Sequence, residues 1–67
     1  MKVLVNGEVR DVDDAATVDD VVCLLPVHDT RGIAVARNGD IVLRSAWTTT
    51  AVADGDRIEV LQAVQGG

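Results

Sequence analysis

The segment KVLVNGEVRDV, residues 2–12, decides the fold because it predicts two neighbouring antiparallel strands. Residues 2–5 and 8–12 contain many strand-forming residues, and Asn6-Gly7 separates the two runs. Asn-Gly between such runs is a strong hairpin signal, since a type I′ turn needs a positive φ at both central positions. Val9 and Val12 do not keep strict alternation, so we expect a bulge or an early end in the second strand.

A short helix is predicted directly after this hairpin. An apolar stripe with the spacing i, i+3, i+4 and i+7 is formed by Val18, Val21, Val22 and Leu25. Thr17 is a good N-cap, and Asp20 stands three residues later, where a capping box places its acid. Pro26 disfavours the helical region at the residue before it, so the helix should end there after roughly two turns.

Further strands are predicted at residues 33–37, 41–43 and 57–64. A second Asn-Gly turn, at residues 38–39, joins the first two of these, and Asp54-Gly55-Asp56 forms a turn before the last. The order is β-β-α-β-β with one further strand, which fits an α+β fold. We therefore expect a mixed four- to five-stranded sheet with one main helix packed on one face. Residues 44–53 are mixed in character, and Thr48-Thr49-Thr50 has no interpretation from the sequence.

Composition limits the function classes. A chain of 67 residues with no Phe or Tyr must build a small core from aliphatic side chains, which argues against a self-contained enzyme. The formal net charge of −5 argues against a nucleic-acid partner. No apolar run approaches membrane-spanning length and no signal-peptide pattern is visible, so a cytoplasmic location is expected. The single cysteine excludes an internal disulfide and a Cys cluster for metal.

The individual reactive side chains suggest structural roles. Cys23, in the predicted helix, is expected to pack in the core, because free Cys is usually buried. His28 is expected on the surface of a loop, and Trp47 in the core. The helix entry carries an acidic cluster, which we interpret as a solvated face that suits the helix dipole: Asp11, Asp13, Asp14, Asp19 and Asp20. No catalytic motif, phosphate-binding loop or metal-ligand spacing is visible.

Gly66 and Gly67, at the C-terminus, are the remaining chemical feature. They leave the terminal carboxylate without neighbouring side chains, on a thin tail that is able to enter a narrow active site. With glycine usage of ~7%, two glycines at a fixed position occur by chance in roughly 0.5% of chains. The carboxylate of Gly67 is therefore a candidate reactive group, and a frayed tail without function is the alternative.

Together these features resemble the ubiquitin-like β-grasp sulfur carriers, and more narrowly the ThiS type, which supplies sulfur for the thiazole ring of thiamin. The resemblance covers essentially the whole chain and implies one β-grasp domain, residues 1–67, with a diglycine tail at about residues 65–67. The matching segments are VLVNG at 3–7, TVDDV at 17–21, IAVARN at 33–38, RSAW at 44–47, DGD at 54–56 and AVQGG at 63–67. The sequence departs from the family at Pro26, which ends the helix early, and at the polar residues 48–50.

The resemblance also implies a mechanism. An E1-type adenylating enzyme, similar to ThiF or MoeB, would use ATP to form an acyl-adenylate at Gly67. Sulfur from a persulfide donor would then produce a thiocarboxylate, which a ThiG-like thiazole synthase would accept. Gly66 and Gln65 would give the tail access to these active sites. In this interpretation the chain is a protein cosubstrate, with no catalytic residue, metal or permanently bound cofactor of its own.

Several alternatives remain open. The small subunit of molybdopterin synthase uses the same chemistry, but that family tends to be longer and richer in Phe, with a Pro pair before its diglycine. Here residues 63–65 are Ala-Val-Gln, and Phe is absent. A carrier for another pathway, such as cysteine synthesis, is a further alternative. A ubiquitin-like protein modifier would have only Lys2 for chain building, and a plain interaction module would not use its tail.

Overall fold

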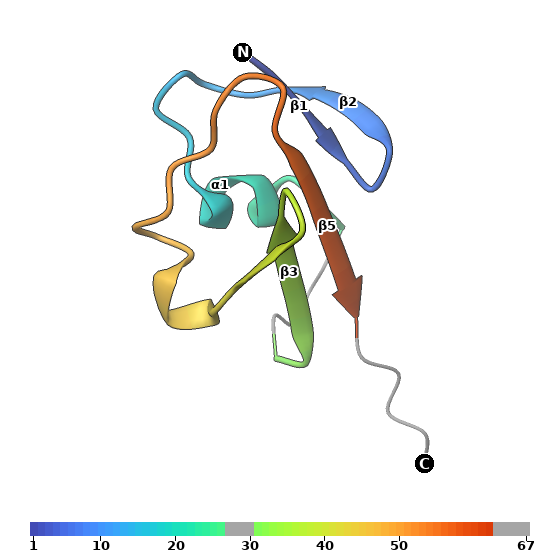
Figure 1. Cartoon of the computed structure of the whole chain (residues 1–67), viewed down its shortest axis with the longest axis vertical. Coiled ribbons are helices and arrows are strands. Elements are labelled where there is room, and N and C mark those ends of the chain that lie inside the picture. The colour runs from blue at the N-terminus through green and yellow to red at the C-terminus, as the bar shows by residue number, and fades with distance from the viewer. Residues whose placement is uncertain (27–30, 63–67) are drawn as a thin grey trace.

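The computed structural model describes residues 1–26 and 31–62, and these residues form a five-stranded sheet with one α-helix and one 3-10 helix (Figure 1). The elements are β1 Lys2–Val5, β2 Glu8–Asp11, α1 Val18–Cys23, β3 Ile33–Arg37, β4 Asp40–Val42, η1 Arg44–Ala46 and β5 Arg57–Gln62. The order of elements and the α+β class agree with the prediction from the sequence.

The sheet is mixed, and its last strand lies at its centre. The strand order is β2-β1-β5-β3-β4. β5 runs parallel to β1 and antiparallel to β3, while each hairpin is antiparallel. The register of the first hairpin is regular from Val5↔Glu8 to Lys2↔Asp11, and β2 ends at Asp11. Of the two expectations for this strand, the early end is therefore confirmed, and the four paired residues show no bulge.

Helix α1 begins with the predicted capping box. The Thr17 hydroxyl accepts from the Asp20 amide, and the Asp20 carboxylate accepts from the Thr17 amide at 2.9 Å. The helix ends at Cys23, with Leu24 as C-cap, shortly before Pro26. Because the helix has only six residues, packing rather than intrinsic helix propensity must stabilise it.

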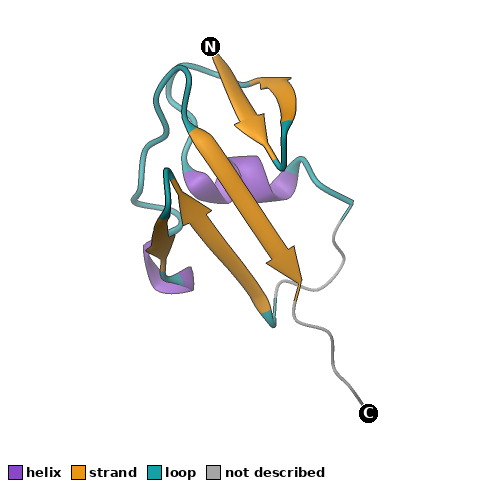
Figure 2. Ribbon diagram, turned by 45° about the vertical axis from the view of Figure 1, so that its right-hand side comes forward, coloured by secondary structure: helices purple, strands orange, loops and turns teal. Residues whose placement is uncertain are grey.

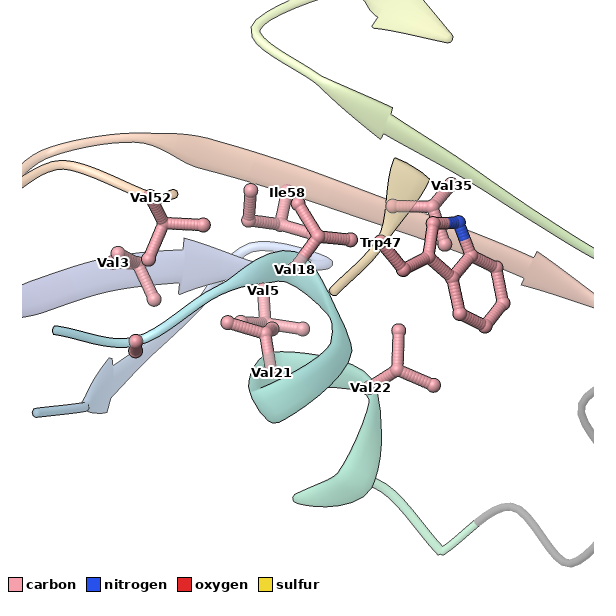
Figure 3. Close-up of a cluster of buried hydrophobic side chains, with 10 residues drawn as sticks. Val3, Val5, Val18, Val21, Val22, Val35, Trp47, Val52 and Ile58 are labelled. Atoms are coloured by element: carbon pink, nitrogen blue, oxygen red, sulfur yellow. The ribbon is translucent and has the colours of Figure 1, made fainter. Parts of the chain in front are cut away.

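The hydrophobic core lies between α1 and one face of the sheet (Figure 3). Val18, Val21 and Val22 of the helix face the inward residues of the central strands. Trp47 is only 2% exposed, and its indole nitrogen donates to the Val42 carbonyl at 3.0 Å, so its predicted core position is confirmed. The buried apolar residues are Val3, Val5, Ala16, Val18, Val21, Val22, Val35, Trp47, Val52 and Ile58.

The segment that the sequence left uninterpreted is an ordered connection between β4 and β5. The hydroxyls of Thr49 and Thr50 donate to the Ala46 carbonyl, at 3.2 and 2.7 Å. The Thr50 carbonyl then accepts from the Val18 amide at 2.9 Å, at the first turn of α1. These hydrogen bonds explain why residues 49 and 50 are polar, because their hydroxyls satisfy the carbonyl at the end of η1. They do not explain the threonine at position 48.

The prediction that Cys23 packs in the core is wrong, because the structure places it on the surface. Successive helical residues are about 100° apart, so the residue after Val22 turns away from the buried stripe. Only one side of α1 faces the sheet, and no other described element covers Cys23 enough to bury it. His28 lies outside the described residues.

Candidate functional site

The exposed face of the sheet along β5 is the candidate site, because this strand leads toward the C-terminal glycines. Ile58 is fully buried, while Arg57, Glu59 and Leu61 point to the opposite, solvent-exposed face. Helix α1 covers only the inner face, so the outer face carries no helix in the described structure (Figure 2). Gln62 is the last described residue. The site residues predicted from sequence, Gln65, Gly66 and Gly67, lie outside the described residues and stay predictions.

Apolar side chains gather on this outer face beside the end of β5. Leu61 pairs with Ala34 of β3, and Ala36 pairs with Ile41 of β4. Alternation along β3 places Ala34 and Ala36 on one face. Leu61 is 69% exposed and Ile41 is 70% exposed. We call these four residues the outer patch. The sequence predicted that side chains along β5 alternate between the two faces of the sheet. It did not predict which residues of other strands lie beside Leu61, because that depends on the strand order.

A second apolar pair lies on the same face at the other side of the sheet. Leu4 of β1 pairs with Val9 of β2, and their exposed fractions are 37% and 63%. Arg57 of β5 pairs with Leu4, and its guanidinium lies 3.5 Å from the Glu59 carboxylate. These two charged residues of β5 lie between the Leu4–Val9 pair and the outer patch, and Leu61 of the outer patch directly precedes Gln62, the last residue of β5.

The start of β5 is held by a buried carboxylate. Asp56 is 7% exposed, and it accepts from Arg37 Nε at 2.6 Å, Asn38 Nδ2 at 2.9 Å and the Ala53 amide at 2.7 Å. Burial by itself raises the pKa of Asp56, but the hydrogen bonds from Asn38, Ala53 and Arg37 outweigh it, and the pKa lies below its ordinary value. The sequence placed Asp56 in a turn and missed this role, because two of its partners, Arg37 and Asn38, come from the β3–β4 hairpin.

A cavity of about 380 Å³ lies on a different part of the surface, between the connection after β2 and helix α1. Two of its three carboxylates already have partners: Lys2 Nζ lies 2.9 Å from Asp11, and Asp20 completes the capping box. The hydrogen bond from Lys2, followed by its charge, lowers the pKa of Asp11. No group of three or more potential metal ligands occurs in residues 1–26 and 31–62. We therefore keep the interpretation of the acidic cluster as a solvated face of the helix entry.

Every buried side-chain nitrogen and oxygen in residues 1–26 and 31–62 has a hydrogen-bond partner. A search of the same residues for a helix of membrane-spanning length and apolarity finds none.

Comparison with known proteins points to one family. The ThiS family model matches residues 3–67. A protein named thiazole synthase, from Paramagnetospirillum magneticum, is 40% identical over all 67 residues of this chain. The chain spans only about a fifth of that relative's length, 20%.

Solved structures agree with this match. The crystal structure of the thiamine biosynthesis protein ThiS from Geobacter metallireducens has a TM-score of 0.81 and 33% identity, with 100% of both chains covered. A solution structure of a thiamine biosynthesis protein from the same organism has a TM-score of 0.80 and 32% identity, and covers 100% of this chain and 88% of the other. The crystal structure of SAMP1 from Haloferax volcanii has a TM-score of 0.66 and 24% identity, and the match covers 98% of this chain and 97% of the SAMP1 chain. At this identity the match supports the fold alone. The expected ubiquitin-like β-grasp fold is confirmed.

Proposed function

Because this chain belongs to the ThiS family, we propose that it is a sulfur carrier for the thiazole ring of thiamin, with Gly67 as the residue that carries the sulfur. The observation that supports this most strongly is the family match, which extends from residue 3 through both glycines to residue 67. The coverage of the Geobacter ThiS structure over 100% of both chains adds to it. This match favours the thiazole pathway over the molybdopterin alternative.

The proposed chemistry begins with the Gly67 carboxylate, which is a poor electrophile. It attacks the α-phosphorus of ATP in the adenylating partner, which forms an acyl-adenylate and releases pyrophosphate. The terminal sulfur of a donor persulfide then displaces AMP, and a second thiol cleaves the resulting S–S bond. This cleavage leaves the thiocarboxylate on Gly67 and a disulfide on the donor side. When the sulfur is transferred to the thiazole precursor, an oxygen atom from the precursor or from water takes its place on Gly67, and the carboxylate is regenerated.

None of these steps needs a nucleophile or an acid–base group from this chain. In the described residues, every buried side-chain nitrogen and oxygen is already held by a hydrogen bond. The fold supplies a rigid body for docking, and residues 65–67 supply reach. ATP is consumed by the activating partner rather than bound here as a cofactor.

Two enzyme partners follow from this chemistry, an E1-type adenylating enzyme and a thiazole synthase. The thiazole synthase is supported by the Paramagnetospirillum relative, because a protein with that name contains a segment 40% identical to this whole chain. A domain linked to an enzyme in one chain is well placed to deliver a substrate to it, since linkage raises the effective concentration.

We also propose that the adenylating enzyme docks on the outer patch. Five residues follow Gln62, and an extended chain spans at most ~3.6 Å per residue, so Gly67 lies within roughly 18 Å of Gln62. An enzyme that holds the Gly67 carboxylate must therefore contact this protein near the end of β5. On the outer face, the apolar surface beside that end is the outer patch, and exposed apolar patches commonly mark protein interfaces.

The sulfur-carrier proposal is tested by mass spectrometry. Incubation with an E1-type adenylating enzyme, ATP and a persulfide donor should give the mass increase of one oxygen replaced by sulfur, located at Gly67. A chain that lacks Gly67 serves as the control and should remain folded but unmodified, since the deletion leaves every described contact in place. An unchanged mass of the full chain with competent partners would refute the proposal. A covalent adduct to lysines of other proteins would instead support the modifier alternative.

A further inference from the structure

Strand β5 continues beyond the end of its parallel neighbour β1, so its later residues lose the backbone ladder on that side (Figure 1). The paired residues are Leu4↔Arg57 and Val5↔Ile58, and the Asn6 amide makes a further bond to the Ile58 carbonyl at 2.9 Å. After Asn6 the chain turns away into the β1–β2 hairpin, with φ values of 50° at Asn6 and 85° at Gly7.

The side chain of Asn6 takes the place of the missing ladder. Its Oδ1 accepts from the Val60 amide at 2.8 Å, and its Nδ2 donates to the Val60 carbonyl at 3.2 Å. In a continued parallel ladder these two groups of Val60 would have bonded to two different residues of a longer β1. The carboxamide of Asn6 supplies both the acceptor and the donor in their place, and it extends the bonding of β5 from Ile58 to Val60.

Asparagine satisfies two demands at position 6. The turn requires a positive φ, which Gly, Asn and Asp tolerate best. The contact with Val60 requires one donor and one acceptor, which a carboxamide supplies. Glycine would meet only the first demand, and aspartate would place a carboxylate against the Val60 carbonyl. Asn6 thus has a second role, the contact with Val60, which the Asn-Gly turn motif does not reveal.

The other Asn-Gly turn provides a matched case at the opposite end of β5. Asn38 has a φ of 52°, and its Oδ1 accepts from the Arg57 amide at 2.9 Å. The two asparagines therefore hold the same strand, Asn38 at its first residue and Asn6 at its fourth. Asn6 is the one whose contact lies nearer to residues 63–67.

We propose that Asn6 is a positioning residue for the sulfur-carrying tail, an inference that rests on the proposed function. By pairing with Val60, it fixes the direction in which β5 ends and from which the tail must reach the adenylating enzyme. A correctly oriented approach increases the rate of the bound complex more than its affinity. Loss of the Asn6 carboxamide should therefore lower kcat for adenylation, while KM, which depends on docking, changes less.

The test compares Asn6→Gly with Asn38→Gly, because each variant keeps its turn and removes one carboxamide. Asn38→Gly also removes the hydrogen bond to Asp56, which makes it the more demanding control. In Asn6→Gly the amide of Val60 should exchange with deuterium about tenfold faster, the loss of one hydrogen-bonding interaction, with no comparable change at Arg57. Asn38→Gly should show the reverse. Asn6→Asp keeps the acceptor and should give an intermediate exchange rate at Val60.

Adenylation kinetics then separate positioning from general destabilisation. Asn6→Gly should lower kcat several-fold more than Asn38→Gly, measured at a temperature where both variants are fully folded. Unchanged Val60 exchange in Asn6→Gly, or equal losses of kcat in the two variants, would overturn the positioning role while wild-type activation still supports the sulfur carrier. If the wild-type chain is not adenylated, the proposed function fails, and the role of Asn6 in it fails as well.

Discussion

Asp56 shows how much a single residue contributes to the geometry of the site. It lies immediately before β5 and accepts hydrogen bonds from Arg37 and Asn38 of the neighbouring hairpin and from Ala53 of its own turn. These contacts join the turn before β5 to the β3–β4 hairpin. The lowered pKa of Asp56 keeps its carboxylate charged at neutral pH, and the residue is only 7% exposed, so the hydrogen bonds from its partners must replace most of its contact with water.

We predict that Asp56→Asn destabilises the protein by about 2 kcal/mol at neutral pH, because the amide loses the ion pair and must turn its NH2 toward a donor. The folded-state pKa of Asp56 is below its ordinary value of 3.8. Its stabilising contribution is therefore present above pH 3.8 and is lost as the pH falls through the folded-state pKa. Urea unfolding of both proteins across this range measures the effect. A difference that stays constant as the pH falls would contradict this assignment.

At the scale of elements, the two hairpins and the helix follow from local chemistry. Both predicted Asn-Gly turns are present with positive φ values at the asparagines, 50° and 52°, as the type I′ prediction for residues 6–7 requires. Helix α1 is different, because six residues rich in Val are marginal without tertiary contacts. The capping box therefore contributes more than intrinsic helix propensity to fixing the residue at which the helix begins.

We predict that Thr17→Ala lowers the free energy of unfolding by about 1 kcal/mol, because the Asp20 amide loses its side-chain acceptor. Thermal or urea unfolding measures the change. Thr48→Ala is the matched control, since Thr48 is exposed and precedes the two threonines that bond to Ala46. That variant should stay within about 0.5 kcal/mol of the wild type. Equal losses in the two variants would argue against a specific role for the cap.

At the scale of the whole molecule, the sheet places a helix on one face and leaves the other open beside the end of β5. The outer patch joins residues from three strands, and Leu61 is 20 to 27 positions from the other three members in the sequence. Such a surface is specific to the assembled fold. Under the proposed function, it would offer the adenylating enzyme a rigid contact beside the end of β5.

We predict that Leu61→Ser and Ile41→Ser each raise KM for adenylation about tenfold, because each removes an exposed apolar contact at the proposed interface. Both side chains are about 70% exposed, so the free energy of unfolding should change by less than about 0.5 kcal/mol. Val9→Ser is the control, since Val9 is also exposed but lies on β2, at the other side of the sheet. If Val9→Ser raises KM as much as Leu61→Ser, the outer patch is not the docking surface.

The local features of this protein follow from short stretches of its sequence. The hairpin at residues 6–7, the Thr17–Asp20 capping box and the strand at residues 33–37 depend on neighbours within four residues, and the structure confirms each of them. The diglycine tail was also evident in the sequence, although the functional roles of Gly67, Gly66 and Gln65 stay predictions.

Tertiary structure alone decided which distant residues meet. It placed β5 between β1 and β3, exposed Cys23, buried Asp56 against Arg37 and brought Asn6 to Val60, 54 positions along the chain. Periodicity reports only whether a side chain faces in or out, and it contains no information on the order of strands. From the sequence, Asn6 and Asn38 were therefore predicted only as turn residues. Their hydrogen bonds to β5 depend on the packing of the sheet.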